Sequence, residues 1–204
     1  AMDIQWEQDT RAKAGPKKPV HESQLLGALS KALTAGALPG ENEGFDAAAC
    51  KVAAQFMLDT AARRSPGKAN IAIESFVDGG GRLAMRVAIV NDDMPFLVDS
   101  VAVALAAANI PIVRLIHPVM AVARDAKGAL QALSGDAGES YIYLETARVD
   151  AKERNALSHR LGSVLHDVRC AVSDWRKMQN AMAADADSLP DDEGAALLRW
   201  FMEG

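Results

Sequence analysis

The residues best suited to chemistry in this sequence lie in one short stretch and just after it. Asn91, Asp92 and Asp93 are consecutive, Asp99 follows soon after them, and His117 is the next histidine along the chain. Carboxylates near the start of a helix could hold a divalent cation, and an Asp could exchange a proton with His117 as an acid/base pair. In a structural interpretation, Asp92 or Asp93 caps the helix and His117 is satisfied within a strand. Asp99 then faces solvent opposite the apolar stripe of the helix, which favours the structural interpretation.

Other patterns do not add a catalytic or nucleotide site. The run Gly79-Gly80-Gly81 leads into a predicted strand, so it lacks the helix N-terminus that binds phosphate in nucleotide-binding loops. Ser158-His159 and His166-Asp167 lie on a long predicted helix, where a solvated face explains them. We therefore expect no catalytic residue, no metal and no cofactor in this chain.

Composition argues against several classes of partner. The 204 residues are 50% hydrophobic, and 22 Lys and Arg against 27 Asp and Glu give a net charge of -5. This charge offers no electrostatic footprint for nucleic acid or for an anionic membrane surface. The longest apolar stretches, such as 94–108, fall short of the roughly 20 residues that span a bilayer. We expect neither nucleic acid nor a membrane as a partner.

The start of the chain and its cysteines indicate the cytoplasm. No basic segment followed by an apolar one resembles a secretory signal, and Ala1 before Met2 is interpreted as a remnant of expression. Cys50 and Cys170 are far apart and have no His or Cys at metal-ligand spacing. We expect two reduced, mostly buried thiols, which form neither a disulfide nor a zinc site.

The chain is predicted to open with an arm and two helices. Residues 1–20 are expected to be a flexible arm, because 8–20 are polar, basic and rich in Pro and Gly. Leucines at helical spacing predict a helix over 21–35, and a second helix is predicted over 45–64 with Val52, Phe56 and Met57 on its inner face. Residues 21–66 are therefore expected to form a small N-terminal helical segment.

The remaining pattern predicts an α+β domain over 67–183. We predict the following elements in chain order: strands 69–77 and 82–90 joined by a turn at Asp78–Gly81, a helix from about 95 to 109, a strand 112–124, a loop 125–139, a strand 140–148, and a helix 150–182. A right-handed crossover gives the sheet order 69–77, 82–90, 140–148, 112–124. This is a ferredoxin-like, antiparallel four-stranded sheet with both helices on one face. Pro118 supports an edge position for strand 112–124.

The last predicted helices extend beyond this sheet. Asp150 and Glu153 make a capping box, and apolar residues then repeat at alternating spacings of four and three. They form a heptad seam that consists of Leu157, Leu161, Val164, Val168, Ala171, Trp175, Met178 and Met182. At about 1.5 Å per residue this helix is roughly 50 Å long, so its far half needs residues 21–64, the last helix or another subunit as cover. Residues 184–204 are expected to begin a following helical or linker segment of a longer polypeptide.

Several short motifs of the sequence are informative when taken together. They are Val90-Asn91-Asp92-Asp93-Met94-Pro95-Phe96-Leu97-Val98-Asp99-Ser100-Val101, His117-Pro118-Val119, Arg124-Asp125 with Gly128, Arg63-Arg64, and Leu198-Arg199-Trp200-Phe201. Through these motifs the chain resembles the N-terminal region of the large bacterial NAD-specific glutamate dehydrogenases. The resemblance implies a parent enzyme that oxidises L-glutamate to 2-oxoglutarate and ammonia with NAD. It also implies that the catalytic lysine and the dinucleotide-binding domain lie far downstream.

Within that family, this region is similar to an ACT domain, a regulatory ferredoxin-like fold that often binds amino acids. The typical ACT pattern is strand, Asp-x-Pro-Gly-Leu-Leu, helix, and residues 93–98 match it except that Phe96 replaces the Gly. The entering hairpin 69–90 also departs from the usual ACT order. The resemblance implies an effector site, for an amino acid if any, at Asn91, Asp92, Asp93, Met94, Phe96 and Leu97.

Three functions are weighed on these observations. The leading hypothesis is a non-catalytic regulatory and assembly module, whose partners are downstream domains of the same polypeptide, further copies in a homo-oligomer and an amino-acid effector. The alternative is a pure oligomerisation scaffold that uses the heptad seam. A third possibility is a self-contained metal-dependent enzyme using Asp92, Asp93 and Asp99.

Overall fold

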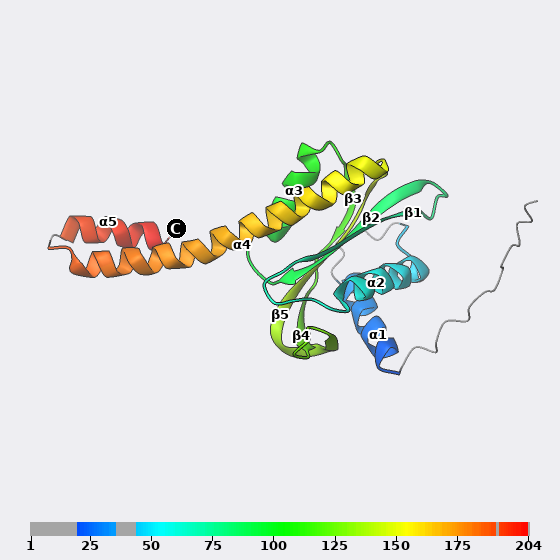
Figure 1. Ribbon diagram of the computed structural model, residues 1–204, viewed down its shortest axis with the longest axis horizontal. Helices are drawn as coiled ribbons and strands as arrows, with labels where there is room; N and C mark the ends of the chain where they lie inside the picture. The colour runs from blue at the N-terminus through cyan, green and yellow to red at the C-terminus, as the bar shows by residue number, and fades with distance from the viewer. Residues whose placement is uncertain (1–19, 36–43, 191, 204) are drawn as a thin grey trace, which may run out of the picture.

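The computed structural model describes residues 20–35, 44–190 and 192–203. In these residues an antiparallel sheet separates two pairs of helices, and one long helix projects far beyond the sheet (Figure 1). The α+β, ferredoxin-like prediction is confirmed, whereas the predicted arm lies outside the described residues except for Val20. The elements in chain order are α1 Val20–Ala35, α2 Ala47–Ala61, β1 Asn70–Val77, β2 Leu83–Asp92, α3 Leu97–Ala107, β3 Ile112–Ile116, β4 Val119–Arg124, β5 Leu130–Ala147, α4 Ala151–Ser188 and α5 Asp192–Glu203.

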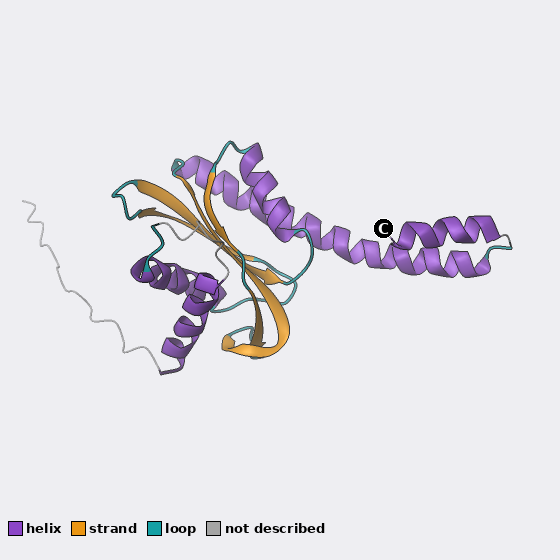
Figure 2. Ribbon diagram, turned by 180° about the vertical axis from the view of Figure 1, so that it is seen from behind, coloured by secondary structure: helices purple, strands orange, loops and turns teal. Residues whose placement is uncertain are grey.

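The sheet has the predicted order, β1-β2-β5-β3, and all its pairs are antiparallel. β1 and β2 form the predicted hairpin around Asp78, whose carboxylate accepts hydrogen bonds from the backbone N–H groups of Gly80 and Arg82 at 2.9 and 2.8 Å. β2 pairs with β5 along its whole length, and Asp92 lies opposite Glu139. β2 and β5 are therefore the central strands, and β5 also carries β4. Figure 2 shows the sheet between the two layers of helices.

The predicted single strand 112–124 is wrong, because it consists of two strands, β3 and β4. His117 and Pro118 separate them, and Pro118 has no N–H to donate to a strand ladder. Its carbonyl still accepts a hydrogen bond from the backbone N–H of Tyr141 at 3.0 Å, so the segment stays on β5. A proline is tolerated at such a break because it lies at the edge of the sheet.

The predicted loop 125–139 is also wrong, because only a short turn at its start is free of the sheet. Asp125 accepts hydrogen bonds from the N–H groups of Lys127 and Ala129 at 2.8 and 2.9 Å, and β5 begins at Leu130. The small residues of this stretch have weak strand propensity, but pairing with β4 supplies partners for their backbone groups. At Gly135 an added Cβ would lie 2.2 Å from the Val122 carbonyl oxygen, so the strands approach too closely there for a side chain.

Each face of the sheet carries its own apolar core. Alternate residues of β2 and β5 point to opposite faces, so Ile89 and Ile142 pack under α3 and α4, whereas Val90 and Tyr141 pack under α1 and α2. The predicted helical segment thus covers the second face. The predicted inward orientation of Val52 is wrong, since its side chain is half-exposed. The buried face of α2 consists of Cys50, Ala53, Ala54, Met57, Leu58 and Ala61.

The capping box that starts α4 is confirmed, with hydrogen bonds between Asp150 and Glu153 of 2.8 and 3.2 Å. The helix runs to Ser188, beyond the predicted end at 182, and α5 folds back against its far half. The apolar seam is buried only over its first part, at Leu157, Leu161, Leu165 and Val168, so Leu165 takes the place predicted for Val164.

Of two predictions about the side chains of α4, one is tested only in part and the other is wrong. Trp175 and Met178 are exposed, so the described parts of residues 21–64 and of α5 do not cover them, and cover by another subunit stays a prediction. Cys170, predicted to be buried, is exposed on the outer surface of α4, whereas Cys50 is buried under α1. None of the helices described is both long and apolar enough to cross a membrane.

The core beneath α4 gives a first prediction. Leu161 is fully buried between α4 and the sheet, so Leu161→Ala should lower the free energy of unfolding by about 2–5 kcal/mol through lost burial and a residual cavity. Leu197→Ala, which removes the same atoms from an exposed position on α5, should change it by less than about 0.5 kcal/mol. Urea denaturation measures both, and equal effects would contradict this packing.

Candidate functional site

The predicted effector loop joins the end of β2 to the start of α3, at the C-terminal edge of a central strand. Asn91 and Asp92 are the last residues of β2, opposite Ser140 and Glu139 of β5. Because side chains alternate along a strand, Asn91 points to the α3/α4 face and Asp92 to the opposite face. The two polar side chains therefore reach different layers of the fold.

A buried network of charges lies beside this loop. We call it the ion-pair network, and it consists of Arg64, Asp92, Arg124, Glu139 and Arg169. At its centre the Glu139 carboxylate, 2% exposed, lies between two guanidinium groups. Its Oε1 accepts from Nη2 of Arg64 at 2.6 Å and from Nε of Arg124 at 2.7 Å, and its Oε2 accepts from Nη2 of Arg124 at 2.8 Å.

Asp92 extends the network to the second face of the sheet. Its Oδ1 accepts from Nη2 of Arg64 at 2.5 Å, and its Oδ2 lies 2.8 Å from Nη1 of Arg169 on α4. The backbone N–H of Gly67 also donates to Oδ2 at 3.2 Å. Arg169 further donates to Oδ1 of Asn91 at 2.7 Å. The loop is thus connected to the α2–β1 segment on one side and to α4 on the other.

The remaining donors of the two arginines hold backbone carbonyls. Nη1 of Arg124 donates to the carbonyl oxygens of Ala61 and Gly128, both at 2.8 Å, and Nη1 of Arg64 donates to that of Lys68 at 2.9 Å. Gly128 has a φ of 78°, and a Cβ there would lie 2.2 Å from the Arg64 carbonyl oxygen. Only glycine fits this close approach of the β4–β5 turn to the end of α2.

The network shifts the titration of its members. Burial alone would raise the pKa of Glu139, but the hydrogen bonds and charges of Arg124 and Arg64 outweigh it and hold that pKa below its usual range. Burial likewise opposes ionisation of Asp92, and Arg64 and Arg169 lower its pKa. Tyr141 is buried beside Glu139, and both effects raise the pKa of its hydroxyl, so it stays neutral.

The other predicted site residues lie around the start of α3. Asp93 is exposed and accepts from the Ser140 hydroxyl at 2.6 Å. Met94 packs against the α3/α4 core and Leu97 is buried in it. Phe96 is 65% exposed. The structure therefore brings the aspartates and Asn91 together at this edge, while the phenyl ring of Phe96 points away into solvent.

The predicted helix cap is wrong. Neither Asp92 nor Asp93 caps α3, which begins at Leu97 instead of about Pro95 and has no side-chain hydrogen bond at its N-cap, Phe96. The reason is that Asp92 pairs with arginines and Asp93 with Ser140. Phe96 adopts the left-handed conformation, with φ 69° and ψ 3°, which is the conformation that the missing Gly would favour.

Two buried polar atoms near this edge lack a hydrogen-bond partner within the described part of the chain. They are Nδ2 of Asn91 and Nε2 of His117. Burial lowers the pKa of His117, and the charge of Asp93 raises it in part, so the imidazole is predominantly neutral at neutral pH. Among the described residues there is no group of three or more candidate metal ligands.

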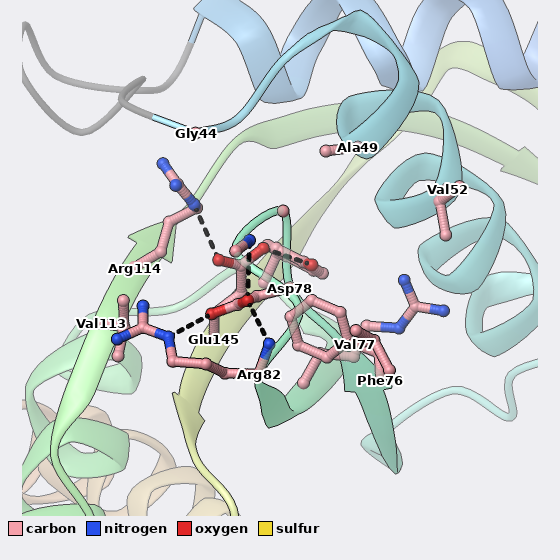
Figure 3. Close-up of a pocket in the computed structure, with 14 residues that line it drawn as sticks. Gly44, Ala49, Val52, Phe76, Val77, Asp78, Arg82, Val113, Arg114 and Glu145 are labelled. Atoms are coloured by element: carbon pink, nitrogen blue, oxygen red, sulfur yellow. Dashed lines mark hydrogen bonds and ion pairs between the residues drawn. The ribbon is translucent and has the colours of Figure 1, made fainter.

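A separate hollow of about 300 Å³ lies on the α1/α2 face, where α2 does not reach the end of the sheet (Figure 3). Four of its charged groups pair with one another: Arg114 donates to Glu145 at 3.0 Å and Arg82 to Asp78 at 3.2 Å. The Tyr143 hydroxyl also donates to Glu145 at 2.9 Å. Sequence reasoning missed this hollow because α2 and four different strands contribute its lining residues.

The sequence comparisons place this geometry in a family. The family model described as "Glutamate dehydrogenase, ACT1 domain" matches residues 30–161, from α1 to the first third of α4. The chain belongs to the glutamate dehydrogenase ACT1 domain family. The ion-pair network and the loop at 91–97 lie within the matched residues, except for Arg169. The resemblance inferred from the motifs is thus confirmed.

Two curated relatives agree with this ACT1 assignment. The chain is 32% identical over 136 residues to an NAD-specific glutamate dehydrogenase of Halomonas elongata, covering 57% of this chain and 8% of that protein. It is 38% identical over 101 residues to an NAD-specific glutamate dehydrogenase of Pseudomonas aeruginosa, covering 46% of this chain and 6% of that protein. The ACT1 chain thus spans less than a tenth of the length of these relatives.

The buried centre of the network gives a second prediction. Glu139→Gln leaves two buried guanidinium groups without their shared counter-charge, so it should lower the free energy of unfolding by about 3–5 kcal/mol. Glu74→Gln, which removes a half-exposed partner of Arg86, should cost less than about 1 kcal/mol. Urea denaturation at neutral pH compares the two, and a small effect at Glu139 would contradict a structural role of the network.

The same network predicts how stability changes with pH. Because the pKa values of Glu139 and Asp92 are lowered in the folded state, their contribution is present above the usual carboxyl pKa of about 4 and is lost as pH falls through the lowered values. The wild-type melting temperature should therefore fall more steeply than that of Glu139→Gln as the pH drops from about 5 to about 3. Parallel curves would show that Glu139 does not contribute.

Proposed function

We propose that this chain is a regulatory and assembly module of an NAD-dependent glutamate dehydrogenase and performs no chemistry itself. In this proposal the longer, cytoplasmic polypeptide oxidises L-glutamate to 2-oxoglutarate and ammonia, and other domains bind NAD and supply the catalytic residues. Membership of the ACT1 family and the names of the two relatives, both NAD-specific glutamate dehydrogenases, support it. The partners in this proposal are the other domains of the same polypeptide and further copies of it.

The connection of the loop to both layers of helices carries the regulatory part of this proposal. Asp92 binds Arg64, which lies between α2 and β1, and also Arg169, which lies on the α4 helix. A ligand that moves the loop would change contacts on both sides of the sheet at once. Coupling of this kind requires that one ligand shifts the positions of two elements at the same time. The ion-pair network physically links these elements, the α2–β1 segment and α4.

An amino acid suits the free groups around this loop. α3 has no side-chain cap, so the N–H groups of its first turn can receive a carboxylate. Asp93 is exposed and suits an ammonium group, whereas two arginines neutralise Asp92, so it does not repel the ligand carboxylate. Asn91 adds a buried N–H donor. Phe96 does not fill this space, because its ring points outward.

Titration of the chain with single amino acids tests this proposal. We expect saturable heat with at least one amino acid at millimolar concentration, and Asp93→Asn should weaken binding by about tenfold or more, because the ammonium loses a full charge partner. Asp187→Asn removes the same charge from an exposed position at the far end of α4 and should change the affinity less than about threefold. No heat, or equal effects of the two variants, would remove the loop as a sensor.

The non-catalytic part of the proposal has its own test. The isolated chain should neither bind NAD at micromolar concentration nor reduce it in the presence of L-glutamate, because the sequence has no glycine-rich loop leading into a helix. Fluorescence titration and absorbance at the NADH band measure both. Turnover, or micromolar NAD affinity, would contradict the assignment.

The alternative is a pure oligomerisation scaffold without an effector. The observation that favours it is the outward apolar surface of α5, where Leu197, Trp200 and Phe201 are exposed. Light scattering separates the two readings when combined with the titrations: a chain that forms stable oligomers above its 21.6 kDa mass but binds no amino acid fits the scaffold.

A further inference from the structure

An apolar groove runs along α4 on one side of Phe96. Six of the residues that line its volume of about 460 Å³ are Pro95, Phe96, Ala171, Val172, Trp175 and Gln179. Phe96 is 65% exposed and Trp175 43% exposed, although both are large aromatic residues. Aromatic side chains at a groove of this kind are typical anchors of an interface.

The backbone at Phe96 indicates that the exposed ring has a use. A non-glycine residue with φ 69° is disfavoured by about 1 kcal/mol or more, and here it presents a phenyl group to water. Strained residues of this kind cluster at ligand clamps and other functional sites. Phe96 also lines a second apolar groove with Val103 and Ala107 of α3, so its ring separates two apolar surfaces.

The groove begins where the packing of α5 on α4 ends. Gln179, which lines the groove, donates from Nε2 to the carbonyl oxygen of Met202 in the last turn of α5 at 3.1 Å. α5 runs antiparallel to α4, and its end lies beside the middle of α4 and points toward the sheet (Figure 1). The groove is therefore continuous with an interface that already exists within the chain.

The register of the two helices identifies what would cover the groove. Met202 lies opposite Gln179, and both helices rise about 1.5 Å per residue, so each residue after Met202 moves about one residue toward the start of α4. Trp175 and Ala171 would then lie opposite the first two turns or so of a helix that continued beyond Met202. A helix that continues α5 in a straight line would pass over Trp175 and reach Phe96.

We propose that the segment that follows α5 in the full-length polypeptide continues as a helix along α4 and buries Phe96 and Trp175 in this groove. The inference rests on the proposed function only in taking this chain as part of a longer polypeptide. It assigns Phe96 a role as an anchor, which links the loop at 91–97 directly to the following domain. The same loop would then contact the effector on its inner side and the rest of the protein through Phe96.

Cysteine labelling in the full-length protein tests this proposal. Ala171 is exposed and lines the groove, whereas the preceding residue, Cys170, is exposed about 100° further around α4 and does not line the groove. A Cys170→Ser, Ala171→Cys variant should react with a maleimide at least about tenfold more slowly in the full-length protein than in the 204-residue chain. The labelling rates of the native Cys170 in the full-length protein and in the 204-residue chain should agree within about twofold. Mass spectrometry of the labelled peptide measures these rates.

A further substitution connects the protection to Phe96. In the Ala171→Cys background, Phe96→Asp should restore fast labelling of the new thiol in the full-length protein. Val103→Asp, at a similarly exposed position, should restore this labelling much less. Equal labelling rates of the Ala171→Cys thiol in the two proteins would overturn the proposal. The proposal would also fail if Cys170 were labelled more slowly in the full-length protein by the same factor as the Ala171→Cys thiol. Protection already present in the 204-residue chain, with twice its mass by light scattering, would assign the groove to a second copy instead. Glutamate dehydrogenase activity of the same full-length sample reports separately on the proposed function.

Discussion

The carboxylate of Glu139 is the constraint on which most of this structure depends. A buried carboxylate is unfavourable by several kcal/mol unless charges and hydrogen bonds compensate it, and here two guanidinium groups do so. Arg64 must therefore lie over β5 from the end of α2, and Arg124 must reach it from β4. Each arginine then uses its remaining N–H groups on nearby carbonyls, which fixes the α2–β1 connection and the β4–β5 turn. One buried acid thus positions the helical segment and the extension of β5 together.

The same network decides what the loop at 91–97 can offer a ligand. Asp92 is committed to Arg64 and Arg169, so the charge that remains accessible is that of Asp93. Because Asp92 is not available to cap α3, the first turn of that helix lacks a side-chain hydrogen-bond partner. The N-cap residue, Phe96, adopts the left-handed backbone conformation. Ion pairs therefore fix the loop where it leaves β2. At the start of α3 its N–H groups have no side-chain cap, and the ring of Phe96 is exposed. This division suits a segment that senses on one side and contacts a neighbouring domain on the other.

Much of the fold could be predicted because its signals are local. The Asp78–Gly81 turn, the capping box of Asp150 and the strand alternation of β1 and β2 each depend on residues a few positions apart, and the crossover rule then gave the sheet order. The strand extension 130–139 could not be predicted in this way. Its Gly- and Ala-rich sequence has little intrinsic strand preference, and only the pairing with β4 stabilises it. The exposure of Trp175 was also hidden, since a heptad spacing does not show how far a partner helix reaches.

By itself, the sequence determined most of the elements and their order, the family, and the stretch around Asn91 to Leu97 as the one worth examining. The tertiary structure alone decided the role of each charge in that stretch. Arg64 and Glu139 lie 75 residues apart, and Arg169 and Asn91 lie 78 apart, and no spacing pattern links such positions. Periodicity and capping arise from hydrogen bonds within a few residues, whereas the partner of a buried charge depends on which segments the sheet brings together. The sequence could therefore indicate where polar groups gather, but not which of them remain free.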